Sequence, residues 1–314
     1  MIVDKPVGVS SQDVVTRLRL RLGVRSAGHT GTLDPLATGV LPLCLGQATK
    51  IAQWLLSDDK RYLCTCELGL TSTTLDTEGE VTRVATVDAI DPAAVEAALV
   101  GLRGELAQVP PMHSAIWIDG RRAHELAREG VTMAPPPRAV RVDELRVVAI
   151  DGPRVTLAIA CSKGTYVRAL VRDLGAALGT GAVVTALRRT ASGRFTLDDA
   201  LAYDEVNYRV VPTRLIPTRV ALGLPEVAVD DAAVVDVING HEQRLARYAE
   251  PFTEGDRFQL VSSQGDTLAV CERRAGRTFV HRGLVYEGRT GLDAAPSVPQ
   301  SPPPQQPGRE PGPD

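Results

Sequence analysis

The segment from Val155 to Leu178 limits the possible folds most, because a strand pattern there passes directly into a helix pattern. The run VTLAIACSKG predicts a buried strand that ends in a turn. The residues after it, TYVRALVRDLGAALG, predict a helix with Thr165 as N-cap and Gly179 beyond its end. The apolar positions that recur at helical spacing are Val167, Leu170, Val171, Leu174 and Leu178. The chain is therefore expected to combine helices and strands in one domain.

Patterns in the rest of the chain predict how it is organised. SSQDVVTRLRLRLG predicts a second helix, capped by Ser10 or Ser11, with Val14, Val15, Leu18 and Leu22 along one face. After about Leu222, short apolar runs between turn signals predict a small β-rich second domain over 223–293. Two domains also suit a chain of 314 residues. The Pro- and Gln-rich segment 294–314 cannot bury enough apolar surface to order itself and is predicted to be a disordered tail.

Composition excludes some classes of protein. The start MIVDKPVG has no basic-then-apolar leader, and no window approaches the roughly 18 apolar residues of a membrane span, so neither secretion nor membrane insertion is expected. The five cysteines have no CxxC pair, and none has a histidine at metal-ligand spacing. We interpret them as reduced core residues of a cytoplasmic protein, with Cys64 and Cys66 on one face of a strand.

The net charge is −3, but it is spread unevenly along the chain. Residues 1–70 and 101–220 have an excess of Lys and Arg, whereas 71–100 and 221–314 have an excess of Asp and Glu. Such segregation is compatible with a nucleic-acid face on an acidic protein, although a modest local excess is usually just a solvated surface.

The stretch AGHTGTLDPLATGVLPLCLG contains a single carboxylate, Asp34, in a glycine-spaced loop. The following proline keeps Asp34 out of helical geometry, and the glycines let backbone approach a ligand closely. A structural turn is the plain alternative. A phosphate-binding loop is disfavoured because the closing lysine and Ser/Thr are absent, and a metal site is disfavoured because only His29 lies nearby. A carboxylate that acts as nucleophile or base remains.

Between Pro110 and Arg141, two proline clusters bracket the basic, partly helical text DGRRAHELAREG. An excursion of this kind from a compact domain is more often functional or mobile than part of the core. Its arginines are placed to clamp a sugar-phosphate backbone.

Several motifs resemble those of one known family. GHTGTLDPLATGVLPLCLGQATK is similar to the catalytic motif of the TruB family of tRNA pseudouridine synthases, and DKPVGVSS, DKRY, SKGTYVRALVRDLG and VTALRRTASGRF follow that family's order over residues 2–220 or so. The resemblance implies an α+β pseudouridine synthase fold, with a mixed, largely antiparallel central sheet flanked by helices and a small PUA-like RNA-binding domain. It implies that residues 1–222 form the catalytic domain, with an RNA-gripping insertion at about 111–140.

The same resemblance implies a reaction. Uridine at position 55 in the T-loop of tRNA is flipped out, detached from its sugar, rotated and rejoined through carbon. No cofactor, no metal and no protein partner are implied, and we expect a monomer that binds the T-arm of tRNA.

Roles for single residues follow from the resemblance. Asp34 resembles the catalytic aspartate, Arg168 its partner, Tyr166 an active-site tyrosine, Tyr62 the residue that stacks on the flipped uracil, and Leu187 the apolar wall. His29 resembles the histidine inserted into the T-loop, Lys5, Lys50 and Asp76 resemble RNA-contacting residues, and Arg121 and Arg122 belong to the gripping insertion. The family often has a carboxylate where this chain has Thr73, so one polar RNA contact is expected to differ.

Physical reasoning supports one of these pairs directly. Arg168 falls in the first turn of the predicted helix, where a cation opposes the helix dipole, and a facing carboxylate would remove that conflict. Taken singly, Tyr62 and Leu187 are better explained by packing and His29 by a backbone bond. A solvated surface explains Lys5 and Lys50 nearly as well as RNA contact does.

Two other function classes stay open. The chain could be a non-catalytic tRNA-binding or tRNA-folding protein of the same fold, against which the intact set Asp34, Tyr62 and Arg168 argues. It could also be a guide-dependent pseudouridine synthase, which the self-sufficient look of the chain disfavours.

Overall fold

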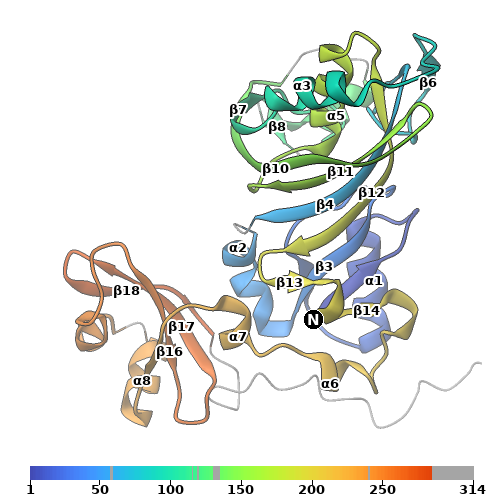
Figure 1. The fold of residues 1–314 in the computed structure, drawn as a ribbon. Helices are drawn as coiled ribbons and strands as arrows, with labels where there is room; N and C mark the ends of the chain where they lie inside the picture. The colour runs from blue at the N-terminus through green and yellow to red at the C-terminus, as the bar shows by residue number, and fades with distance from the viewer. Residues whose placement is uncertain (57–58, 115, 119, 130–134, 240, 285–314) are drawn as a thin grey trace, which may run out of the picture.

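The computed structural model describes residues 1–284 except 57–58, 115, 119, 130–134 and 240. A ten-stranded sheet forms its centre (Figure 1). The main path of that sheet runs β14 (Ala200–Ala202), β1 (Ile2–Lys5), β3 (Thr38–Leu45), β12 (Ala182–Ser192), β4 (Lys60–Leu68), β11 (Arg154–Cys161), β10 (Arg138–Asp151) and β7 (Gly104–Gln108). Two short strands lie off the path, β2 (Ala27–His29) beside β3 and β13 (Phe195–Thr196) beside β12.

The sheet is mixed and largely antiparallel, as predicted. Among the described strands of this sheet, only the β1–β14 and β3–β12 pairs are parallel, whereas β12–β4, β4–β11, β11–β10 and β10–β7 are antiparallel. The crossover that places β12 between β3 and β4 brings the segment 182–192 beside the N-terminal loop that contains Asp34 (Figure 1).

One face of the sheet is covered by three helices, α1 (Ser11–Leu22), α3 (Pro92–Val100) and α5 (Val167–Ala177). Alternate strand residues point to this face, so Val3, Leu41, Cys64 and Cys66 join one core cluster. Apolar helix residues pack onto it from α1 (Val14, Val15, Leu18, Leu22), from α3 (Val95, Leu99) and from α5 (Val167, Leu170, Val171, Leu174). All five cysteines are free and buried, which agrees with their predicted place in the core.

The helix ends test the capping predictions. Ser10 caps α1 and forms a capping box with Asp13. For α5 the predicted cap is wrong, because the N-cap is Tyr166 and no side chain caps the helix. The Thr165 hydroxyl instead donates to the Ser162 carbonyl in the preceding turn. The sequence offers no signal that this local bond competes with capping.

The opposite face of the β1–β3 end carries the 3₁₀ helix η1 (Gly46–Ile51), α2 (Ala52–Leu55) and α7 (Thr218–Leu222). Ile2, Val40 and Cys44 point to this side, where they meet Ile51 and Leu55. Val270 of the C-terminal strands belongs to the same cluster, so this layer joins the central sheet to the C-terminal part of the chain.

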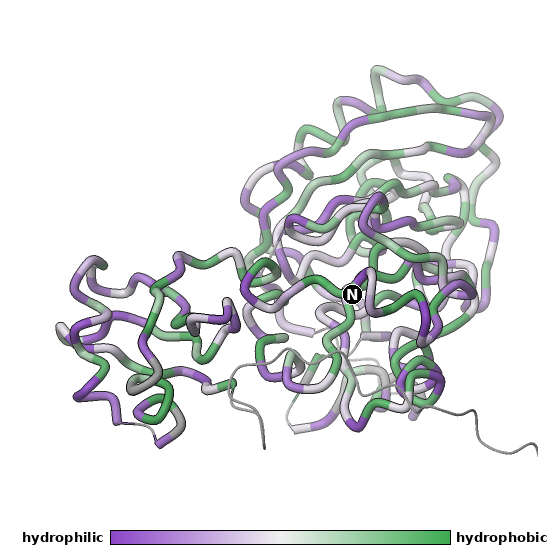
Figure 2. The backbone as a smooth tube through the Cα atoms, turned by 90° about the horizontal axis from the view of Figure 1, so that it is seen from below, coloured by the Kyte–Doolittle hydropathy of each residue, from purple (hydrophilic) through white to green (hydrophobic). Residues whose placement is uncertain are grey.

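Residues 226–283 form a four-stranded sheet of their own, in the order β15 (Glu226–Ala228), β16 (Arg257–Val261), β17 (Thr267–Arg274) and β18 (Arg277–Gly283). Helix α8 (Asp231–Asn239) and η4 (Ala246–Ala249) accompany it, and a separate core cluster includes Leu245, Phe258, Leu260 and Cys271. Both views place this sheet beside the larger body (Figure 2). The predicted tail 294–314 lies outside the described residues.

The other elements are short. They are β5 (Leu70–Ser72), β6 (Val81–Arg83), β8 (Trp117–Ile118), β9 (Arg121–Arg122), α4 (Ala123–Arg128), η2 (Leu197–Asp199), η3 (Tyr203–Glu205) and α6 (Val211–Arg214). In the ranges that the structure describes, no helix is long and apolar enough to cross a membrane.

Candidate active site

Asp34 and Arg168 form the centre of the candidate site. Asp34 lies in the loop between β2 and β3, and Arg168 is the second residue of α5. The guanidinium donates from Nη2 to Asp34 Oδ1 at 3.0 Å, and Nε lies 2.9 Å from Oδ2. The contact is therefore a two-point fork that fixes the direction of the carboxylate as well as its distance. It is the facing carboxylate that the position of Arg168 in the helix predicted.

Arg168 is itself fixed from several sides. Its side chain is 6% exposed, whereas that of Asp34 is 34% exposed. Nη1 donates to the Thr74 carbonyl at 2.7 Å and lies 3.4 Å from Asp76 Oδ2, while Nη2 also donates to the His113 carbonyl at 3.0 Å. The cation is thus buried and held by several hydrogen bonds, and the carboxylate that it holds remains open to solvent on one side.

The protonation of Asp34 depends on opposing causes. Burial raises the pKa of Asp34 above its usual value, the Arg168 charge opposes that rise, and the nearby Asp76 charge adds to it. The sequence predicted the effect of Arg168 in the correct direction, but burial outweighs it. The pKa of Asp34 is therefore sensitive to any change in Arg168.

Lys5 does not lie where an RNA contact requires it. The residue is fully buried at the end of β1, and its Nζ donates to the carbonyls of Pro6 at 2.9 Å, Val9 at 2.6 Å and Pro35 at 3.2 Å. Burial lowers the pKa of Lys5 to about 8, against the opposing charges of Glu78 and Asp34. Because the ammonium is occupied by three carbonyls, we assign Lys5 to support of the Asp34–Pro35 loop rather than to RNA.

Asp76 is also placed differently from an RNA contact, since it is only 1% exposed. Its Oδ1 accepts a 2.5 Å hydrogen bond from the Thr74 hydroxyl and a 3.1 Å bond from the Glu78 amide, and its Oδ2 faces Arg168. Burial, followed by the charges of Asp76 and Asp34, raises the pKa of Glu78. Asp76 therefore supports Arg168, and its burial argues against a contact with RNA.

Tyr62 and Leu187 lie on the two neighbouring strands β4 and β12. Leu187 is directly opposite Cys64, is 7% exposed and belongs to the core cluster that Tyr62 also packs against. Tyr62 is half-buried, and burial raises the pKa of its phenol while the Arg189 guanidinium opposes the rise. The two side chains supply an aromatic ring and an apolar wall in the same sheet segment.

Tyr166 connects the site to the insertion. Gln108 holds its backbone in both directions, accepting from the Tyr166 amide at 2.8 Å and donating to the Tyr166 carbonyl at 3.1 Å. Its ring packs with Met112 against the small insertion cluster formed by Ile116, Ile118, Ala123 and Leu126. Burial raises the pKa of the Tyr166 phenol, and a hydrogen bond with Ser114 opposes the rise.

Among the described side chains, His29, Lys50 and Arg121 form no hydrogen bond or ion pair with Asp34 or Arg168. His29 is half-buried on β2 with its Nδ1 buried and unbonded in the described part of the chain, and burial, then the Arg189 charge, lowers its pKa. Lys50 is half-buried in η1. Arg121 is exposed on β9 and pairs with Glu129, while only the backbone of Arg122 is described.

Sequence reasoning missed Arg189, which is 1% exposed. It is the second of two consecutive arginines in β12. Arg188 forms a half-exposed two-point pair with Asp4, at 2.7 and 3.1 Å, whereas Arg189 points inward. The signal was available, because in a strand the residue two after a buried Leu187 shares its face.

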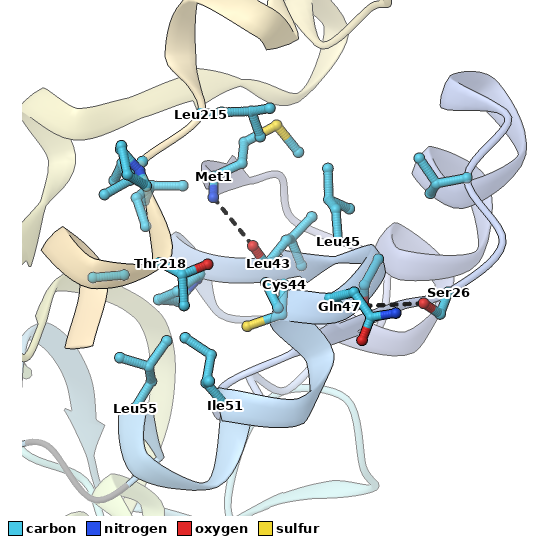
Figure 3. A pocket seen from close by; sticks show the side chains of 18 of the residues that line it. Met1, Ser26, Leu43, Cys44, Leu45, Gln47, Ile51, Leu55, Leu215 and Thr218 are labelled. Carbon is cyan, nitrogen blue, oxygen red and sulfur yellow. Dashed lines mark hydrogen bonds between the residues drawn. The ribbon is translucent and has the colours of Figure 1, made fainter. Parts of the chain in front are cut away.

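A separate cavity of about 610 Å³ lies between β3, η1 and the segment 215–221 (Figure 3). Its walls are mainly apolar and include Leu43, Cys44, Ile51 and Leu55. No predicted site residue is among the described residues that line it. In the part of the chain that the structure describes, there is also no group of three or more His, Cys, Asp or Glu side chains arranged to hold a metal ion.

Comparisons with known proteins agree on one family. Residues 19–167 match the model of the TruB family pseudouridylate synthase N-terminal domain, and 168–214 match that of the tRNA pseudouridylate synthase B C-terminal domain. The chain is 42% identical over 286 residues, 88% of its length and 93% of the relative's, to tRNA pseudouridine synthase B of Burkholderia pseudomallei (strain 668). The Pseudomonas syringae pv. syringae (strain B728a) protein of the same name is 48% identical over 208 residues, 66% of this chain and 67% of its own.

Solved structures share the fold. A Cbf5–Nop10–Gar1 complex superposes with a TM-score of 0.65 at 24% identity, covering 90% of this chain and 84% of that chain. An H/ACA RNP bound to a substrate RNA containing 2'-deoxyuridine gives a TM-score of 0.66 at 23% identity, over 91% and 86%. At these identities the likeness shows the pseudouridine synthase fold alone.

Proposed function

Because the chain belongs to the TruB family, we propose that it is a tRNA pseudouridine synthase that converts the uridine at position 55 of the T-loop to pseudouridine. The observation that carries the proposal is the Arg168–Asp34 fork, in which a buried cation aims a partly exposed carboxylate. A carboxylate held in this way can attack a sugar carbon or stabilise positive charge that develops there.

The chemistry requires the base to leave its stack. A side chain cannot reach the glycosidic bond of a stacked uridine, so the nucleotide is extruded at a cost of a few kcal/mol. Stacking of the uracil on Tyr62 offsets about 1–3 kcal/mol of that cost. Leu187 and the neighbouring core exclude water from the apolar side of the ring.

The reaction balances without any added reagent. The bond from uracil N1 to the sugar C1' breaks, and Asp34 forms a covalent adduct or assists departure of the base. The uracil turns, its C5 bonds to C1', the C5 proton is lost, and N1 gains a proton. The product has the same atoms as the substrate.

The remaining assignments belong to the same proposal. Residues 1–222 are the catalytic domain, 223–293 a PUA-like RNA-binding domain, and the insertion at about 111–140 grips the T-arm of tRNA while the enzyme acts as a monomer. Tyr166 and the His113 carbonyl tie the start of the insertion to Arg168, which supports a link between T-arm contact and the catalytic centre.

The experiment is incubation of the protein with an unmodified tRNA transcript, followed by mapping of pseudouridine at single-nucleotide resolution. We expect one product at position 55, and none in a transcript with cytidine there. Tight binding without product would favour the non-catalytic tRNA-folding protein, and product that appears only with an added guide RNA would favour the guide-dependent alternative.

A further inference from the structure

Arg189 is a buried cation that bonds backbone carbonyls. The residue is 1% exposed and is among the largest fully buried side chains of the described chain. Its Nε donates to the Val40 carbonyl at 2.7 Å and its Nη2 to the Gly31 carbonyl at 3.1 Å. Burying a charge is unfavourable unless hydrogen bonds compensate it, so an arginine in this position is expected to have a specific task.

The two carbonyls flank the catalytic loop. Gly31 precedes Asp34 by three residues, and Val40 lies in β3 after the loop has rejoined the sheet. The approach of β12 to this region is close, because a Cβ on Gly39 would lie 2.2 Å from the Arg189 carbonyl oxygen. Gly31 and Gly39 have φ values of +128° and +103°, which other residues rarely adopt. The loop is therefore shaped to receive Arg189 and is held by it at both ends.

Arg189 also reaches Tyr62. The two residues are directly opposite each other in the β12–β4 pair, where β12 separates β3 from β4 (Figure 1). The charge of Arg189 and a hydrogen bond from it oppose the rise that burial causes in the pKa of the Tyr62 phenol. One guanidinium thus bonds the loop that carries Asp34 and the phenol of Tyr62 on the neighbouring strand.

We propose that Arg189 is a positioning residue that fixes the Asp34 loop and the Tyr62 ring in one geometry. This inference rests on the proposed function, in which the uracil stacks on Tyr62 while Asp34 acts at the sugar. A planar guanidinium can serve all three partners at fixed angles, which an ammonium cannot. Arg189 acts through Tyr62 and Asp34 and need not touch the substrate.

The test separates binding from chemistry in Arg189→Met and Arg189→Lys. Single-turnover rates with saturating enzyme report the chemical step, and titration with unmodified tRNA reports the dissociation constant. Misplacement of reacting groups by about 1 Å can reduce a rate by about 100-fold. We expect losses of this order in both variants, with tRNA affinity changed by less than about threefold, because the RNA-facing surface stays intact.

Arg188→Met is the matched control, since it removes the neighbouring arginine of the same strand and its half-exposed pair with Asp4. Its single-turnover rate should equal that of the wild type. A Tyr62→Phe variant completes a double-mutant cycle, in which Arg189→Met combined with Tyr62→Phe should lose less than the product of the two single losses. A merely structural arginine would give multiplicative losses.

The outcomes distinguish the inference from the proposed function. No pseudouridine from the wild type refutes the proposed function itself. If the wild type is active, three results refute the positioning role alone. They are an Arg189→Met variant as active as the wild type, an Arg189→Met variant that loses only tRNA affinity, and multiplicative losses in the double-mutant cycle. Should Arg189→Met not fold, Arg189→Lys, which keeps the charge on a slightly shorter side chain, gives the same test.

Discussion

Arg168 and Asp34, which are 134 residues apart in sequence, meet through two contacts of 2.9 and 3.0 Å. The arrangement is one-sided, because Arg168 is nearly inaccessible while a third of the Asp34 side chain faces solvent. The pair resolves the dipole conflict in the first turn of α5 and leaves the carboxylate available to a substrate.

Replacement of Arg168 by Met should change both rate and pH dependence. The charge of Arg168 is the largest cause that lowers the pKa of Asp34, so without it burial raises that pKa further. Turnover at neutral pH should fall by orders of magnitude and recover partly as pH rises and Asp34 ionises. Tritium release from uracil-labelled tRNA between pH 6 and 9 measures this profile, and a wild-type profile would show that the pair has no role in catalysis.

The change Asp76→Asn distinguishes support of Arg168 from RNA contact. The amide oxygen can still accept from the Thr74 hydroxyl and the Glu78 amide, but the charge beside Arg168 is lost. Chemistry should slow, and the unfolding free energy should fall by about 1–3 kcal/mol, while tRNA affinity stays constant. Filter binding, single-turnover assays and urea unfolding measure the three quantities. A selective loss of affinity would restore Asp76 to the RNA-contacting residues.

The lowered pKa of Lys5 predicts how the unfolding free energy depends on pH. Its pKa is about 8 in the folded protein against an ordinary value of 10.5, so between these values the unfolded chain binds more protons and the unfolding free energy rises with pH. The gain should reach at most about 3 kcal/mol and be absent below pH 8, where both states are protonated. Urea unfolding at pH 7 to 10 of the wild type, with Lys5→Met subtracted, isolates this contribution. Parallel curves would mean that Lys5 titrates normally.

If the arginines of the insertion contact tRNA phosphates, they should contribute to the salt dependence of tRNA binding. Joint substitution of Arg121 and Arg122 by Ala should weaken tRNA binding and reduce the slope of log affinity against log salt by roughly 0.7–0.9 for each lost phosphate contact. Arg19→Ala, on the exposed side of α1, removes a charge elsewhere and is the control. If the wild type, the Arg121/Arg122 double variant and Arg19→Ala all gave the same slope of log affinity against log salt, the result would argue against a clamp.

Particular residues show what the sequence could predict. Both helices read from apolar spacing are present, with Ser10 and the apolar faces as expected, since periodicity reports directly which side is buried. The Arg168–Asp34 contact followed from a helix-dipole conflict together with the family motifs.

Other features depend on tertiary contacts that no local pattern reports. Lys5 and Asp76 are expected from the family resemblance to contact RNA, yet both are buried, because their partners are carbonyls and a guanidinium brought in by distant segments. For Arg189 the strand alternation with Leu187 indicated burial, but its partners at Gly31 and Val40 lie some 150 residues earlier in the chain and no local pattern identifies them. The hydrogen-bond partners of a buried charge come from segments that the fold brings together, and the sequence around the charged residue does not identify those partners.

Asp34→Asn tests the central claim most directly. The amide preserves the shape of the side chain and removes the nucleophilic charge, so the variant should bind unmodified tRNA within a few-fold of the wild type and form no pseudouridine. The measurement is tritium release from uracil-labelled tRNA, with the wild type in parallel. Complete loss of release with retained binding is the predicted result, and substantial turnover by Asp34→Asn would contradict the account.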